Sequence, residues 1–97
     1  MTIKVKMTNI RPSADVPWYD KNETTTDLIN GYIQSGDLIS VNINYISDLV
    51  VETITEYKDQ NSKDLIHSNT VWIKLISDMI EYYKANSISI DVEEEVY

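Results

Sequence analysis

The sequence predicts an α+β domain with the element order strand–helix–strand–strand–helix–strand. Apolar and polar residues alternate near the start of the chain, in two successive runs in its middle and again near its end. Between these runs, two segments space their apolar residues three and four apart, as an amphipathic helix does. Two strand–helix–strand units with right-handed crossovers give the ferredoxin-like sandwich. Its four-stranded antiparallel sheet has the order 4-1-3-2, with two helices on one face.

The first half of the chain predicts a strand, a long loop and a helix. Alternation over residues 3–8 predicts a strand with one buried face. Residues 9–22 contain both prolines and show no periodicity, which predicts a loop. A helix is expected between the threonines at 24–26, whose hydroxyls can cap its start, and Gly36, which ends it.

The middle of the chain predicts a hairpin. Residues 39–45 are apolar at every odd position, and residues 49–57 are rich in β-branched side chains. In the second of these strands we expect Glu52 and Glu56 on the outer face, although this choice exposes Val50 and Ile54. Two unpaired buried carboxylates would cost far more free energy than two exposed aliphatic side chains.

A second helix is expected within residues 62–85, with Asn61 or Ser62 as its N-cap and Asn86 as a left-handed C-cap. Whether Ser68-Asn69-Thr70 breaks this helix is left open by the sequence. The stripe expected to be buried against the sheet is Trp72, Leu75, Ile76, Met79, Ile80 and Tyr83.

The outer face of the sheet is predicted to be charged and internally paired. Lys4 and Lys6 lie on the central first strand, and Asp91 and Glu93 lie on the neighbouring last strand, residues 88–97. Such a face lacks the aromatic side chains on which RNA-binding domains of this fold stack bases. It also offers little for an apolar cavity between two paired sheets, which counts against a barrel enzyme.

Composition limits the classes of function further. The 97 residues make a single domain, 1–97, with 16 acidic and 8 basic residues and a net charge of −8. This acidity repels phosphate, so we predict no nucleic-acid partner and, with no apolar run that spans a bilayer, no membrane partner. The absence of cysteine excludes disulfides and thiolate zinc sites.

Candidate chemistry is sparse. His67 is the one histidine, and no recognisable motif places a nucleophile beside it, so a structural role is favoured over a general base. The acidic run 91–95 alternates between two faces and lacks the glycine turn of a calcium loop. We therefore predict no catalytic residue, no metal site and no cofactor.

The loop after the first strand exceeds the needs of a simple connection and predicts a protein contact, because Trp, Tyr and Arg dominate interface hot spots. The edge strand can add to a neighbouring sheet. The predicted contact residues are Arg11, Pro12, Asp15, Pro17, Trp18, Tyr19, Val41, Ile43 and Tyr45. In the alternative, Trp18 and Tyr19 cap the core while Arg11 pairs with Asp15.

The segment from Asn9 to Tyr19, NIRPSADVPWY, resembles a recurrent opening in small ferredoxin-like, α+β-barrel-like proteins of marine tailed phages. The segment from Tyr83 to Ile88 is similar to the helix end of those proteins, with serine at position 87 where glycine is usual. The resemblance implies a phage origin, a role in the virion or its assembly, and a location in virions that are assembled in the host cytoplasm.

From these observations we predict a non-enzymatic structural protein, a small phage virion component of the head decoration, neck or tail. Its partners would be other virion proteins or further copies of itself, in an oligomer or assembly. One alternative is a small dimeric α+β-barrel enzyme of the monooxygenase or isomerase type, which requires a ligand-sized cavity. The other is an acidic phage effector that binds a host protein.

Overall fold

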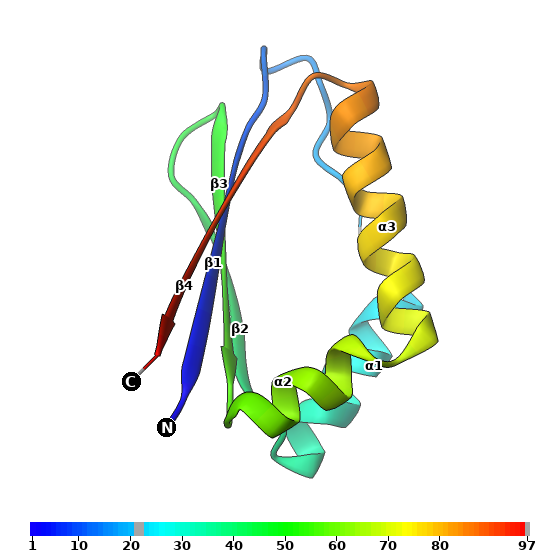
Figure 1. The fold of residues 1–97 in the computed structure, drawn as a ribbon. Helices are drawn as coiled ribbons and strands as arrows, with labels where there is room; N and C mark the ends of the chain where they lie inside the picture. The colour runs from blue at the N-terminus through cyan, green and yellow to red at the C-terminus, as the bar shows by residue number, and fades with distance from the viewer. Residues whose placement is uncertain (21–22, 97) are drawn as a thin grey trace.

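The computed structural model describes residues 1–20 and 23–96 and contains four strands and three helices. The helices all lie against one face of the sheet (Figure 1). In chain order the elements are β1 Ile3–Ile10, α1 Glu23–Ser35, β2 Leu38–Tyr45, β3 Val50–Tyr57, α2 Gln60–His67, α3 Thr70–Ala85 and β4 Ser89–Val96. None of the described helices is long and apolar enough to cross a membrane.

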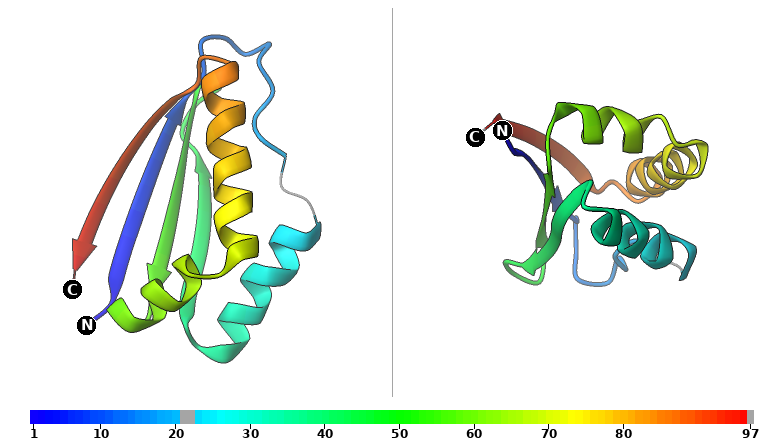
Figure 2. Two further views of the ribbon diagram at one scale, coloured as in Figure 1. Left: turned by 45° about the vertical axis from the view of Figure 1, so that its right-hand side comes forward. Right: turned by 90° about the horizontal axis from the view of Figure 1, so that it is seen from below.

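The sheet has the order β2-β3-β1-β4, which is the predicted 4-1-3-2 order counted from the other edge, and every pairing is antiparallel. The predicted ferredoxin-like fold is therefore confirmed. Two views of the ribbon show the strongly twisted sheet with α1 and α3 side by side over it (Figure 2). The central strand β1 runs on to Ile10, because residues predicted as loop continue the pairing with β3 and β4.

Facing of the strands follows the prediction. Lys6 lies opposite Ile54 of β3 and Glu93 of β4, and its ammonium group is 3.5 Å from the Glu93 carboxylate. Val51 and Tyr57 are buried on the other face of β3, beneath the helices. The lysines of β1 therefore lie on the outer face together with Glu52 and Glu93, as expected from the cost of burying carboxylates.

Strand β2 departs from the predicted alternation at its first residues. Leu38 is buried opposite Tyr57, while Ser40 is paired with Glu56, so an irregularity in the register falls at Ile39. Such a bulge inserts one residue and shifts the alternation. As a result Ile39, expected on the buried face, is exposed, and Leu38 takes its place in the core.

Both open questions about the second helical segment are settled by helix caps. The helix is broken, because Oδ1 of Asn69 accepts hydrogen bonds from the amides of Val71 and Trp72 and so starts α3. The first piece is capped by Asp59, which accepts from the amide of Ser62 at 2.8 Å. The predicted cap at Asn61 or Ser62 is wrong, because both residues lie inside α2.

Two further predicted caps are wrong. The backbone of Asn86 has φ of −107°, and the left-handed residue is Ser87, with φ of 59°. The amide of Ile88 then donates to the carbonyl of Tyr83 at 2.9 Å, which is the bond of a Schellman motif. At the other helix, α1 begins at Glu23, so the threonines at 24–26 lie within its first turn instead of before it.

The buried residues form two clusters, one at each end of the layer between sheet and helices. The first contains Ile3, Leu38, Tyr57 and Ile66. The second contains Met79, Tyr83 and Ile88, with Trp18 and Tyr19 of the long loop packed against it. The two ends of the helical layer are thus fixed to the sheet, and the space between them is less completely filled.

Candidate functional site

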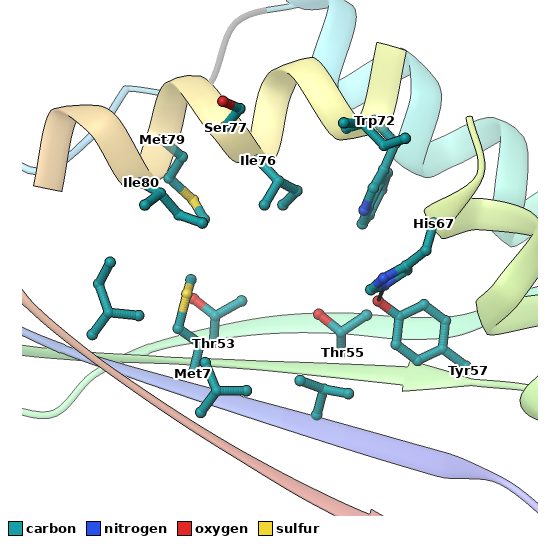
Figure 3. Close-up of a pocket in the computed structure, with 14 residues that line it drawn as sticks. Met7, Thr53, Thr55, Tyr57, His67, Trp72, Ile76, Ser77, Met79 and Ile80 are labelled. Atoms are coloured by element: carbon teal, nitrogen blue, oxygen red, sulfur yellow. Dashed lines mark hydrogen bonds between the residues drawn. The ribbon is translucent and has the colours of Figure 1, made fainter. Parts of the chain in front are cut away.

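An apolar cavity of about 510 Å³ lies between α3 and the sheet. Met7 of β1 points toward Met79 and Ile80 of α3 across this cavity (Figure 3). Its lining residues come from β1, β3, β4, the end of α2 and α3. They are Val5, Met7, Thr53, Thr55, Tyr57, His67, Trp72, Ile73, Ile76, Ser77, Met79, Ile80, Ile90 and Val92.

The cavity exists because α3 is not seated closely on the sheet along its length. Of the six residues expected to form its buried stripe, Met79 and Tyr83 are buried and Ile76 is 37% exposed. Beneath the helix, β3 presents Thr53 and Thr55, which are too short to fill the gap. On the open side, Val92 of the edge strand β4 is 56% exposed. The expected fully buried stripe is therefore wrong.

Polar and aromatic groups gather at the end of the cavity nearest α2. The hydroxyl of Tyr57 lies 2.9 Å from Nε2 of His67, and the two rings meet edge to face with centroids 5.6 Å apart (Figure 3). The Trp72 ring lies beyond, 6.3 Å from the His67 ring. The helix break at Asn69 is what allows His67, at the end of α2, and Trp72, in α3, to approach the same cavity from two helices.

The surroundings of this pair keep both side chains uncharged near neutral pH. Burial, reinforced by the negative charge of Glu94, raises the pKa of Tyr57 to about 12. His67 is exposed as a residue, and burial of part of its side chain removes some of its hydration. This desolvation, together with the charge of Lys63, lowers the pKa of His67. His67 is thus a neutral imidazole held by a neutral phenol.

An ion pair between α2 and the edge strand β4 lies beside the His67–Tyr57 pair. The ammonium group of Lys63 in α2 contacts Glu94 Oε1 in β4, so it links the edge strand to the helix that carries His67. Apart from His67, the described residues that line the cavity carry no ionisable group with a pKa near neutrality. The site therefore suits an uncharged ligand.

The predicted contact loop is tied to the body of the domain. Arg11 donates to the backbone carbonyls of Val16 and Asp48, and its guanidinium lies 4.6 Å from the centroid of the Trp18 ring. Arg11 therefore satisfies backbone oxygens instead of pairing with Asp15, which is exposed. Pro12 is also exposed.

The second half of the same loop packs on α3. The Tyr19 ring lies 5.6 Å from that of Tyr82 and 6.3 Å from that of Tyr83, and the Tyr82 hydroxyl donates to the carbonyl of Pro17. Tyr19 and Trp18 thus cap one end of the core, as the alternative expected. A role of this loop in contacts with other proteins stays a prediction.

The three contact residues of the edge strand point toward the helical side of the sheet. Their partners across the strand pair are Thr55, Thr53 and Val51, which face the helices. Val41 is half-buried against the first core cluster, whereas Ile43 and Tyr45 are exposed by 40% and 69%. A contact through this edge also stays a prediction.

Within residues 1–20 and 23–96, no group of three or more histidine or carboxylate side chains is placed to hold a metal ion. The acidic run in β4 is divided between the two faces of the sheet, since Glu93 pairs with Lys6 on the outer face and Glu94 pairs with Lys63 on the inner one.

No family model matches the chain, and no curated protein matches it. Solved structures do share its fold. One is a conserved protein of unknown function from Bacteroides thetaiotaomicron, described as a possible oxidoreductase, with a TM-score of 0.65 and 8% identity over 99% of this chain and 97% of that one.

Two further solved structures of the same fold have a TM-score just below 0.6. A candidate antibiotic biosynthesis monooxygenase from Deinococcus radiodurans has a TM-score of 0.58 and 6% identity over 100% of this chain and 92% of that one. A dimeric ferredoxin-like protein from an uncultured marine organism has a TM-score of 0.57 and 13% identity over 99% and 94% of the two chains. At such identities the likeness shows the fold.

These findings correct the predicted function. A non-enzymatic virion component is not what the structures of similar fold suggest, since one is described as a possible oxidoreductase and another as a candidate monooxygenase. The descriptions fit the alternative of a small α+β-barrel enzyme better, and they disagree with the prediction of no enzymatic activity. The prediction considered a cavity only between two charged outer faces. The apolar cavity lies instead on the inner face of the sheet, beneath α3 of a single chain.

The residues of this site were visible in the sequence but were assigned other roles. The sequence predicts a structural role for His67 because no recognisable motif places a nucleophile beside it, whereas its partner in the structure is Tyr57, ten residues earlier. The available signal was the pair of inward threonines, Thr53 and Thr55, in a strand that should have packed large aliphatic side chains under a helix.

Proposed function

We propose that this chain is a small enzyme of the monooxygenase- or isomerase-like α+β-barrel class, acting on an uncharged apolar molecule in the cavity beneath α3. The observation that carries the proposal is the Tyr57–His67 hydrogen bond at one end of an otherwise apolar cavity. Pockets of this kind, apolar with a few convergent polar groups, are where small molecules bind. Relatives of the same fold described as an oxidoreductase and a monooxygenase support it.

The proposed chemical role of His67 is that of a general base. Its lowered pKa keeps the imidazole able to accept a proton at neutral pH. The role requires the tautomer in which Nε2–H donates to the Tyr57 hydroxyl, which fixes the orientation of the ring and leaves Nδ1 as the proton acceptor. A substrate with an acidic O–H or C–H group beside a carbonyl would place that group near the imidazole. Loss of this proton to His67 leaves an enolate or phenolate, a starting point for isomerisation or for oxygenation.

Proton exchange tests this role directly. Apolar enols, and ketones whose enol form is a phenol, are dissolved in D₂O and followed by proton NMR. The protein is expected to accelerate the exchange of their acidic C–H hydrogen for deuterium. His67→Gln should abolish the acceleration, while Lys84→Gln, an exposed substitution at the far end of α3, should leave it unchanged. Equal exchange with the wild-type protein and with His67→Gln would overturn the assignment.

We further propose that the chain forms a dimer through the outer face of its sheet. No described helix covers this face, and its lysine row lies between two rows of carboxylates, so a two-fold rotation can set lysines of one copy over acids of the other. The dimeric relative from a marine organism supports self-association. Sedimentation velocity should show a dimer that Ile54→Lys disrupts; disruption by Ile43→Lys instead would place the contact at the β2 edge.

A further inference from the structure

A second, smaller chamber lies on the other side of the α3 side chains. Its volume is about 110 Å³, and it is located between α1, α3 and the strands β2 and β3. Ile29 of α1, Val41 of β2 and Leu75 of α3 contribute to this chamber and not to the large cavity. Tyr19, Thr25 and Tyr83 complete the part of its wall that the large cavity does not share.

The two spaces have a common wall made of side chains. Six residues line both of them: Met7, Thr53, Thr55, Trp72, Ile76 and Met79. Two of the six are methionines, whose unbranched side chains change rotamer readily. Met7 and Met79 project toward each other from β1 and α3 (Figure 3), so a rotamer change in either can connect the chamber with the cavity.

The size and the lining of the chamber favour a small, uncharged occupant. The described residues that line it carry no charge: six are aliphatic residues or methionines, and the polar atoms of the other six are threonine and tyrosine hydroxyls and the indole N–H. A cavity of about 150 Å³ lined by leucine, isoleucine and phenylalanine stays dry and binds benzene or xenon. A chamber of about 110 Å³ is therefore too small for the organic ligand that the large cavity could hold, and it is sufficient for a diatomic gas.

We propose that this chamber is a binding site for a small apolar molecule, and that its occupant during the reaction is dioxygen, held behind Met79 next to the organic substrate. The binding site itself depends only on the geometry of the chamber. The assignment of dioxygen rests on the proposed function. The oxygenation considered is one in which the deprotonated molecule itself supplies all four electrons: one oxygen atom replaces two hydrogens of the substrate as a new carbonyl oxygen, and the other leaves as water. Such a reaction needs dioxygen beside the deprotonated molecule.

Xenon is the probe for the test, because it binds apolar cavities and scatters X-rays anomalously. Crystals of the full chain held under xenon pressure should show a xenon atom among Ile29, Leu75 and Met79. Val41→Phe and Leu75→Phe fill the chamber from opposite sides and should each remove that atom. Ile80→Phe, which narrows only the large cavity, should leave it in place. Circular dichroism confirms that each variant is folded.

The possible results separate the two proposals. An empty chamber in the wild-type protein, or xenon retained in both filled variants, overturns the inference whatever the enzymatic result. Xenon in the chamber together with no proton exchange at His67 overturns the proposed function and leaves the binding site established. With a substrate in hand, Val41→Phe should raise the KM for dioxygen and leave the KM for the organic substrate unchanged; the reverse pattern contradicts dioxygen as the occupant.

Discussion

The hydroxyl of Tyr57 lies 2.9 Å from Nε2 of His67, which joins the buried end of β3 to the exposed end of α2. The pair is a boundary between the first core cluster, to which Tyr57 belongs, and the apolar cavity. Its geometry depends on the helix break two residues after His67. Without that break, α2 would continue along the direction of α3, and the imidazole would be carried away from the sheet.

The first prediction concerns the separate contributions of His67 and Tyr57 to turnover. His67→Gln should lower the turnover of a substrate by about 100-fold or more, because it removes the general base. Tyr57→Phe keeps the ring and removes the hydroxyl, so it should cost only about fivefold, the equivalent of about 1 kcal/mol for one hydrogen bond. Steady-state kinetics measures both. Tyr45→Phe, which alters an exposed tyrosine outside the cavity lining, serves as the control, and equal losses in the His67 and Tyr57 variants would refute the assignment.

The second prediction is a pH dependence of stability. The pKa of His67 is lowered in the folded state from its ordinary value of 6.5, so the unfolded chain binds the extra proton first. The free energy of unfolding should therefore fall as the pH drops below about 6.5. Lys63 lowers the pKa of His67 while Asp64 and Glu94 raise it, and other groups titrate in the same range.

Comparison with a variant isolates the histidine contribution. Urea titrations of the wild-type protein and His67→Gln between pH 5 and 8 (roughly, the range in which histidine titrates) give the difference in the free energy of unfolding. The wild-type protein should lose stability relative to the variant as the pH falls. A flat difference would show that folding leaves the pKa of His67 unchanged, and a change in the other direction would show that folding raises it; either result contradicts the prediction.

The third prediction concerns the C-terminal end of α3. Ser87 has φ of 59°, a conformation that costs serine free energy and glycine almost none. Ser87→Gly should thus stabilise the protein by roughly 1 kcal/mol, measured by thermal or chemical denaturation. The same substitution at Ser89, which lies in the extended strand β4, should destabilise it by roughly 0.5–1 kcal/mol. A loss of stability in Ser87→Gly would contradict the left-handed assignment.

The fourth prediction separates the two bonds of Asn69. Its Oδ1 caps α3, and its Nδ2 donates to the Tyr32 hydroxyl at 2.8 Å, which links α3 to α1. Tyr32→Phe preserves the cap and loses only the bond from Nδ2 of Asn69, at a cost of about 1 kcal/mol. Asn69→Ala loses both, at a cost of about 2 kcal/mol. Chemical denaturation measures both values, and the same cost for the two variants would mean that the cap contributes nothing.

Element order and strand facing could be predicted because each depends on local periodicity. Alternation over β1 and the cost of burying Glu52 were sufficient to place the lysine and glutamate rows on the outer face. The helix break was recognised as one of two outcomes, since Asn69 is both a good N-cap and an ordinary helix residue. Its bond to Tyr32, 37 residues away, is a tertiary contact that periodicity does not record.

The site could not be predicted because it is made of incomplete packing. The sequence pattern of an apolar stripe such as Ile73, Ile76 and Ile80 is the same whether the facing strand fills the space beneath the helix or leaves it open. The decisive quantity is the volume between α3 and the sheet, which depends on how Ile66 and Ile88 fix the two ends of the helical layer. Likewise, the Tyr57–His67 bond arises where two elements meet and has no signature in the spacing of residues.

The most direct test of the central claim is a ligand titration of the isotope-labelled protein followed by NMR. An uncharged apolar enol or phenol should shift the indole N–H signal of Trp72, the imidazole signals of His67 and the methyl signals of Ile80, all of which line the cavity. The methyl signals of Ile54 on the outer face should stay unchanged. Shifts confined to the outer face, or none with any compound of the panel, would contradict a functional site beneath α3.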